Sequence, residues 1–151
     1  MDTQETIDIL NDLIETSKDG EYGFRTSAEQ VKTPSLRSLL ERRATECAQA
    51  ASELQQVVLR LGGKAEESGS AAGAMHRGWV AVKSTLSTYD DKAVLEEVER
   101  GEDVALESYR DALQEDLPPE VRSLVERQFE GVKRNHAQMR ALRDQTTAGS
   151  R

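Results

Sequence analysis

The sequence predicts an all-α fold, a bundle of four long helices. Charged residues make up 32% of the chain and aromatic residues 4%, and helix-favouring residues such as Ala, Leu, Glu, Gln and Arg recur throughout. Apolar residues repeat at intervals of three and four over long segments, which is the period of an amphipathic helix. The breaks between these segments carry proline or paired glycine, at Pro34, Gly62-Gly63 and Pro118-Pro119.

The first half of the chain predicts a helical hairpin, with helices over residues 3–31 and 35–61. Gly20 interrupts the first pattern, so we expect close packing against a neighbour or a local bend there. Pro34 stands near the first position of the second helix, where proline is favoured. Gly62-Gly63 ends that helix. The short break between the two helices predicts that they run antiparallel.

The second half predicts a short helix at 70–86 and two long helices, one ending near residue 114 and one over 118–144. Two tight hairpins joined by a long connection place the second and third long helices parallel. The short helix lies in this crossover. We predict one domain over residues 1–146, followed by a flexible tail over 147–151.

Composition excludes several classes of partner and activity. The net charge of −8 disfavours nucleic acid, and no apolar run is long enough to span a membrane. The N-terminus lacks the pattern of a signal peptide, and the single cysteine cannot form an intrachain disulfide. No complete catalytic motif occurs. These observations predict a cytoplasmic protein without a nucleic-acid or membrane partner.

One acid lies within an apolar stripe and requires a partner. Glu102 falls near the middle of the stripe on the third long helix, with Tyr109 two turns further on. An unpaired buried carboxylate is too costly to persist. Arg43, on the apolar face of the second helix, is its natural partner. We predict a buried polar layer of Arg43, Glu102 and Tyr109 with Gln128 or His136.

Two alternatives use the same region of the bundle. Glu102 and His136, with Glu46 or Glu53, could hold iron or manganese as an atypical metal site. Cys47 lies on the core face of the second helix, where it is either a small buried residue or a reactive thiol activated by the arginine one turn away.

Short motifs along the chain resemble a known family. They are Asp19-Gly20, Gly23-Phe24, Glu53-Leu54, Leu61-Gly62-Gly63, His76-Arg77-Gly78-Trp79, Glu99-Arg100-Gly101-Glu102-Asp103, Leu117-Pro118-Pro119 and Asn135-His136. On these motifs the chain resembles a proteobacterial family of uncharacterised four-helix-bundle proteins in the ferritin-like superfamily, described as a domain of unknown function. The resemblance implies a ferritin-like bundle with a long crossover between its second and third helices.

The resemblance also permits a comparison with the superfamily's di-iron members, bacterioferritin and rubrerythrin. They carry a Glu on the first helix and an ExxH on the second, and repeat the pair on the third and fourth. Here Cys47 and Ala50 take the ExxH positions of the second helix, and Lys133 and His136 those of the last. Only Glu102 and His136 match ligands, so a degenerate di-iron site is implied.

The function that follows is a non-catalytic binding or assembly module, with a stress-related role implied by analogy with the superfamily. The alternative is an atypical metal-binding or redox protein. Because no long apolar face is left unaccounted for, we expect a monomer, a small homo-oligomer or a complex with a protein partner.

Overall fold

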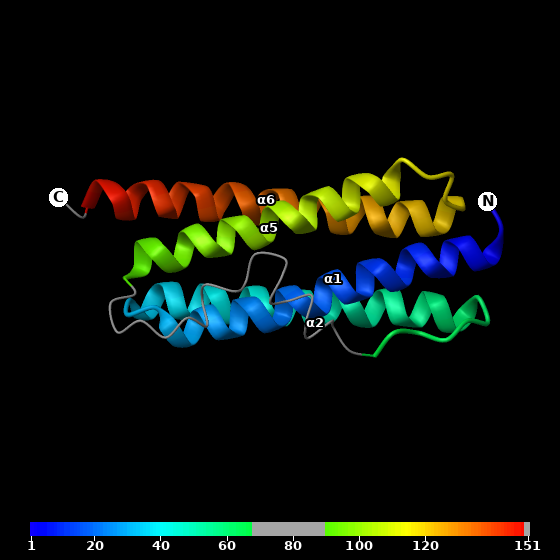
Figure 1. Cartoon of the computed structure of the whole chain (residues 1–151), viewed down its shortest axis with the longest axis horizontal. Helices are drawn as coiled ribbons and strands as arrows, with labels where there is room; N and C mark the ends of the chain where they lie inside the picture. Colours follow the sequence, from blue (N-terminus) through cyan, green and yellow to red (C-terminus); the bar gives the residue numbers. More distant parts are fainter. Residues whose placement is uncertain (68–89, 150–151) are drawn as a thin grey trace.

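The computed structural model describes residues 1–67 and 90–149, and within these ranges the chain forms four α-helices and no strand (Figure 1). Their bounds are Thr3–Gln30 for α1, Pro34–Arg60 for α2, Asp91–Leu113 for α5 and Pro119–Gly149 for α6. The predicted all-α fold is confirmed. The last helix continues past its predicted end at Asp144, because the polar residues that follow weaken the apolar pattern without breaking the helix.

The helices follow the topology that the loop lengths predict. α1 and α2 run antiparallel, α5 and α6 run antiparallel, and α2 and α5 point in the same direction (Figure 1). α1 packs closely on α2 and also contacts α5, whereas α6 packs on α5 and only loosely on α2. The helix predicted over residues 70–86 lies outside the described residues. None of the described helices has a stretch long and apolar enough to cross a membrane.

Aspartate side chains begin two of the helices. Asp2 accepts a hydrogen bond from the backbone N–H of Glu5 at 2.8 Å, and Asp90 accepts one from that of Ala93 at 2.8 Å. An N-cap carboxylate satisfies a backbone donor that has no partner within the helix. These two carboxylates therefore mark where α1 and α5 begin.

Paired glycines end α2 as predicted. Gly62 adopts a φ of 83°, in the left-handed region that glycine enters without strain. The N–H of Gly63 then donates to the carbonyl of Val58 at 2.9 Å. A Cβ at Gly63 would lie 2.6 Å from Cδ1 of Ile7, so the chain after α2 passes very close to α1.

The apolar core is divided into two clusters along the length of the bundle. One contains Ile7, Leu10, Leu13, Ile14, Ala51, Leu54, Val57, Val58, Tyr109, Ala112, Leu117, Val121 and Val125. The other contains Phe24, Ala28, Val31, Leu36, Leu39, Leu40, Ala44, Val94, Leu95, Val98 and Met139. On each helix the residues between the two clusters belong to a middle layer, at about 15–23, 45–50, 99–108 and 126–138.

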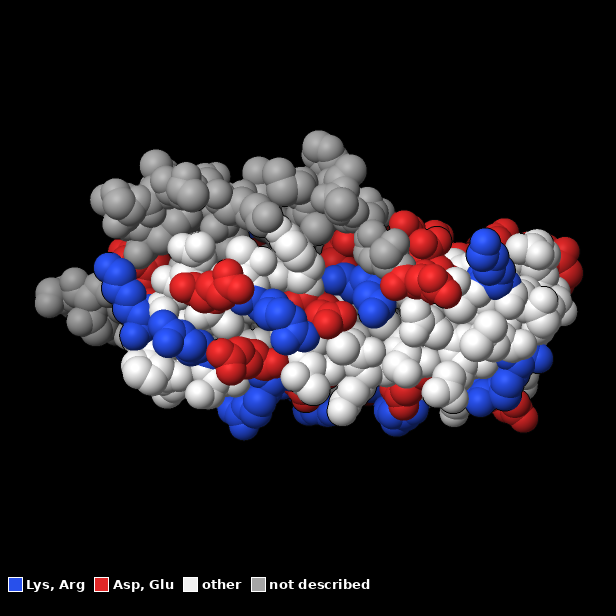
Figure 2. Space-filling model, turned by 90° about the horizontal axis from the view of Figure 1, so that it is seen from below, with Lys and Arg blue, Asp and Glu red and all other residues white. Residues whose placement is uncertain are grey.

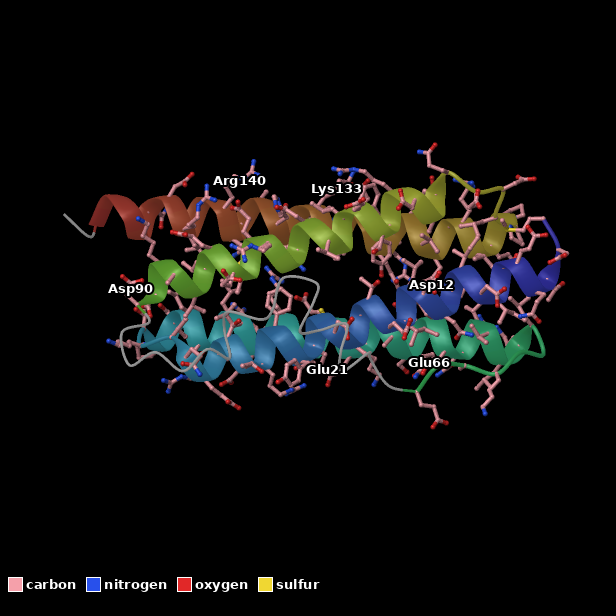
Figure 3. The ribbon with its side chains drawn as sticks, viewed as in Figure 1. Asp12, Glu21, Glu66, Asp90, Lys133 and Arg140 are labelled. Atoms are coloured by element: carbon pink, nitrogen blue, oxygen red, sulfur yellow. The ribbon has the colours of Figure 1, made fainter. Side chains whose placement is uncertain are left out.

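Charged side chains cover the outside of the bundle. Lys133 and Arg140 point away from it on α6, and Glu21 does so on α1 (Figure 3). These positions match the polar faces that the helical pattern predicts. Charged residues that lie in the middle of the bundle are therefore exceptions to this pattern.

The glycine pair provides a test of the helix ending. We expect Gly62→Ala to lower the free energy of unfolding by roughly 1–2 kcal/mol, because alanine is strained at positive φ. Gly131→Ala is the matched control. It lies inside α6, where an added Cβ meets, among the described residues, only the end of Arg134 at 3.8 Å, so it should be neutral or stabilising. Urea unfolding measures both; equal effects of the two changes would contradict this account.

Candidate functional site

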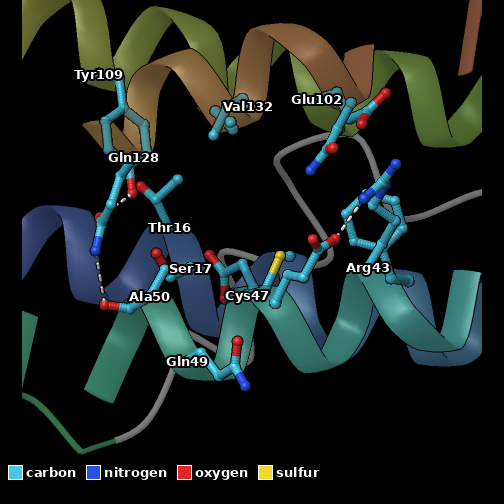
Figure 4. A pocket seen from close by; sticks show the side chains of 18 of the residues that line it. Thr16, Ser17, Arg43, Cys47, Gln49, Ala50, Glu102, Tyr109, Gln128 and Val132 are labelled. Carbon is cyan, nitrogen blue, oxygen red and sulfur yellow. Dashed lines mark hydrogen bonds and ion pairs between the residues drawn. The ribbon is translucent and has the colours of Figure 1, made fainter. Parts of the chain in front are cut away.

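A cavity of about 510 Å³ occupies the middle layer between the two apolar clusters (Figure 4). All four helices contribute to its wall, which includes Ser17, Gly20, Arg43, Cys47, Ala50, Gly101, Glu102, Ala105, Gln128 and Gly131. Several of these residues are glycine or alanine. Small side chains at one level leave space between helices that pack tightly above and below it.

Glu102 is a buried acid of this cavity, as the sequence predicts. Glu102 is 3% exposed, and its Oε1 atom has no hydrogen-bond partner among the described residues. Burial raises the pKa of Glu102 to about 8; Arg43 lowers it, and the acids Asp103 and Glu99 raise it further. The carboxyl is therefore mostly protonated at neutral pH, because a desolvated carboxylate is unfavourable.

Arg43 enters the same cavity from α2, on the side facing Glu102 (Figure 4). Its guanidinium donates to Glu46 on its own helix and to Gln138 on α6. Its Nε atom is buried and has no partner among the described residues. The two predicted partners thus share one cavity and interact electrostatically. Among the described contacts no hydrogen bond or ion pair joins Arg43 to Glu102, so the predicted direct pair is not formed in this structure.

Tyr109 and Gln128 form the hydrogen-bonded part of the layer. The Tyr109 hydroxyl donates to Oε1 of Gln128 at 2.7 Å. Nε2 of Gln128 donates to the carbonyl of Ala50 at 3.2 Å and to Oε1 of Glu53 at 3.1 Å. Burial raises the pKa of Tyr109, so the phenol stays protonated and acts as a donor. The side-chain amide of Gln128, on α6, therefore links Tyr109 on α5 to Ala50 on α2.

His136 lies apart from this cavity. Its Nε2 atom is 2.7 Å from Oδ1 of Asp103 on α5, and it lines a separate surface hollow with Arg110 and Arg140. Of the two residues predicted as alternatives for the polar layer, the structure brings Gln128 to Tyr109. His136 is buried as a histidine bonded to an outer carboxylate, away from Glu102.

Cys47 lines the cavity as a free, half-buried thiol. Burial raises the pKa of Cys47 to about 12, with a further rise from Glu102. Nucleophilic and redox reactions of cysteine proceed through the thiolate, so this environment opposes the predicted alternative of a reactive thiol. Its Sγ lies 3.1 Å from the position of a Cβ added at Gly20. Gly20 is thus a close-packing point between α1 and α2, as the sequence predicts.

A family model described as Domain of unknown function (DUF2383) matches residues 5–115 of the chain. The chain belongs to this family. The matched residues include Arg43, Cys47 and Glu102, whereas Gln128 lies beyond them. The predicted resemblance to a domain of unknown function is confirmed. No functionally curated protein matches the sequence of this DUF2383 chain.

Several solved structures share the fold of this DUF2383 chain. A dodecameric thioferritin from Bacteroides fragilis, described as bacterioferritin-related, has a TM-score of 0.78 and 14% identity, over 99% of this chain and 91% of that one. A mutant Dps protein from Mycobacterium smegmatis has a TM-score of 0.75 and 16% identity, over 92% and 95%.

Dps from Vibrio cholerae, described as a member of a broad superfamily of ferritin-like diiron-carboxylate proteins, has a TM-score of 0.74 and 16% identity, over 93% of this chain and 89% of that one. Identities this low establish the fold alone. The DUF2383 chain is a ferritin-like four-helix bundle, as predicted.

The described side chains do not fit a site for iron or manganese. Of the four predicted ligands, Glu46 is paired with Arg43, Glu53 is paired with Arg127, and His136 lies outside the cavity. Of the four, only Glu102 keeps an oxygen without a partner among the described residues. Within residues 1–67 and 90–149, no three Asp, Glu, His or Cys side chains are grouped to hold a metal ion.

Sequence reasoning missed two residues that shape this region. Asp19 is 3% exposed and lines the cavity, although it lies two positions after Ser17, on another side of the helix from the apolar stripe. Its place beside Gly20 in a family motif was the available signal. Gln138, which accepts from Arg43, carries no comparable signal, because helical spacing does not show which long polar side chains meet across a seam.

The pKa of Glu102 predicts how stability depends on pH. The free carboxyl titrates near 4.5 and the folded one near 8, so the folded state binds an extra proton between these values. Stability present at pH 4.5 is therefore lost as the pH rises to 8, by up to about 1.4 kcal/mol per pH unit. We expect Glu102→Gln, which cannot ionise, to gain on the parent protein steadily between pH 5 and pH 8.

Urea unfolding of both proteins across this range measures the difference. Glu96→Gln is the control, because Glu96 is exposed on the same helix. Parallel profiles for the parent and Glu102→Gln would show that Glu102 has no raised pKa.

Proposed function

We propose that this protein is a non-catalytic binding module whose central cavity holds a small molecule at the level where di-iron relatives hold metal. The observation that carries this proposal is a cavity of about 510 Å³ lined by Glu102, whose buried Oε1 has no partner among the described residues. A buried polar atom left without a hydrogen bond costs about 1–3 kcal/mol. A bound molecule that donates to this atom recovers that cost.

The chemistry of the cavity supports binding over catalysis. Its thiol is held protonated by burial, and the hydroxyl of Tyr109 is engaged with Gln128. Catalysis by a nucleophile requires a base within hydrogen-bond reach to activate it, and Cys47 has no such partner among the described contacts. The volume falls within the range of small-molecule sites, roughly 300–1,000 Å³.

An atypical metal-binding or redox protein is the second candidate. What supports it is the fold, together with neighbours described as a thioferritin and as a diiron-carboxylate protein. Glu102 and His136 would be its ligands, with Glu46 or Glu53. Because three of these four side chains are paired or turned elsewhere, the donor set favours the first candidate.

We also propose a cytoplasmic, bacterial protein that exists as a monomer or small homo-oligomer, with a stress-related role by analogy with its fold relatives. One neighbour is dodecameric, which supports self-association. The large apolar residues exposed in the described part of the chain, Met1, Tyr22 and Leu59, are scattered, which favours a small assembly. Acidic and basic side chains are mixed on the face in Figure 2, which with the charge of −8 disfavours nucleic acid.

Metal content separates the two candidates. We expect protein purified without chelators to carry iron and manganese at well below one ion per chain, because the predicted ligands are engaged with other side chains. Elemental mass spectrometry measures this, with a chelator-treated sample as the control. Near-stoichiometric iron or manganese that chelation removes would reverse the ranking and support the metal-binding candidate.

A further inference from the structure

Two residues that line the cavity each hold a buried polar atom with no hydrogen-bond partner among the described residues. Oε1 of Glu102 comes from α5, and Nε of Arg43 comes from α2 (Figure 4). The Arg43 side chain is 11% exposed and Glu102 is 3% exposed, so water reaches neither atom freely. Nε of Arg43 offers a hydrogen-bond donor, and the protonated carboxyl of Glu102 offers an acceptor together with an O–H donor.

The neighbouring polar groups are already engaged. The two terminal nitrogens of Arg43 donate to Glu46 and Gln138. The amide of Gln128 is bonded to Tyr109 through its oxygen and to α2 through its nitrogen. Among the fully buried polar atoms of the described cavity wall, Oε1 of Glu102 and Nε of Arg43 are the two that lack a partner.

We propose, as an extension of the binding function above, that the cavity takes a small neutral molecule with an amide-type group, whose N–H donates to Glu102 and whose C=O accepts from Arg43. Amides, ureas and lactams carry this donor and acceptor in one planar group, with the N–H and the oxygen attached to the same carbonyl carbon. A single group of this kind satisfies both buried atoms, and each recovers a hydrogen bond whose absence is costly.

The charges around the two atoms favour a neutral ligand. Burial keeps Glu102 mostly protonated at neutral pH, since its pKa is about 8, and Glu46 offsets the charge of Arg43. A cation would lie beside the guanidinium. An anion would have to compete with Glu46 for the guanidinium of Arg43.

The rest of the wall fits a compact apolar body. Phe24, Val104, Ala105 and Val132 line the cavity together with the small residues of the middle layer. Apolar surface that enters such a wall contributes binding free energy in proportion to its area. The amide group then fixes the orientation, as a few placed polar groups do in other small-molecule sites.

Access runs through the seam between α2 and α6. These helices pack loosely, and long side chains join them: Arg43 to Gln138, Gln128 to Glu53, and Arg127 to Glu53. Flexible polar side chains at a surface change rotamer rapidly. This loosely packed seam is the side from which a small molecule would enter.

Three probes of nearly identical shape test the ligand class: benzamide is neutral, benzoate is an anion and benzamidine is a cation. We expect amide NMR titration of the full chain at pH 7 to show that benzamide binds most tightly, with shifts gathered at cavity residues such as Gly101 and Ala105. Arg43→Met and Glu102→Leu should each weaken benzamide binding about tenfold, the effect of one hydrogen bond.

Two further variants control for structural damage. Glu102→Gln keeps an acceptor oxygen and should retain benzamide binding, and Glu96→Leu changes an exposed acid on the same helix and should leave it unchanged. Tighter cavity binding by benzoate or benzamidine would overturn the neutral class while leaving the binding function intact. No cavity shifts with any of the three probes would overturn both proposals.

Discussion

The burial of one carboxyl group between two apolar clusters is the constraint on which this structure depends. Glu102 is 3% exposed, and the helices cannot close around it without leaving its oxygen unpaired. Glycine and alanine lie at the same level, among them Gly101, Ala105 and Gly131. Their side chains are too small to fill the space between the helix backbones. The result is a cavity in the middle of a bundle whose two ends have ordinary apolar cores.

This constraint makes the four sides of the bundle unequal. The two hairpins and the contact of α1 with α5 are packed closely, whereas α2 meets α6 loosely and through long polar side chains. Hydrogen bonds at a solvent-facing seam contribute little net stability. The seam is therefore the side on which the bundle opens most easily, and it leads to the cavity.

The sequence predicts the fold and the central acid, but only part of the acid's surroundings. Apolar period and the breaks at Pro34 and Gly62-Gly63 determine helix number and order, and Glu102 within a stripe marks a buried acid. Which side chain meets which is harder, because helical period gives a face and not the neighbour opposite. His136 bonds to Asp103 on α5, and Arg43 donates to Glu46 and Gln138. The helical pattern does not show which of several possible polar partners each side chain contacts.

The protonation state of Glu102 tests the central claim most directly, because a buried and unpaired carboxyl must titrate far above its ordinary range. Side-chain carboxyl ¹³C NMR of the folded protein, with the Glu102 signal assigned by its loss in Glu102→Gln, follows this titration. The account predicts an inflection near pH 8. An inflection near 4.5, the ordinary value for glutamate, would mean that Glu102 is ionised at neutral pH, and would contradict the account.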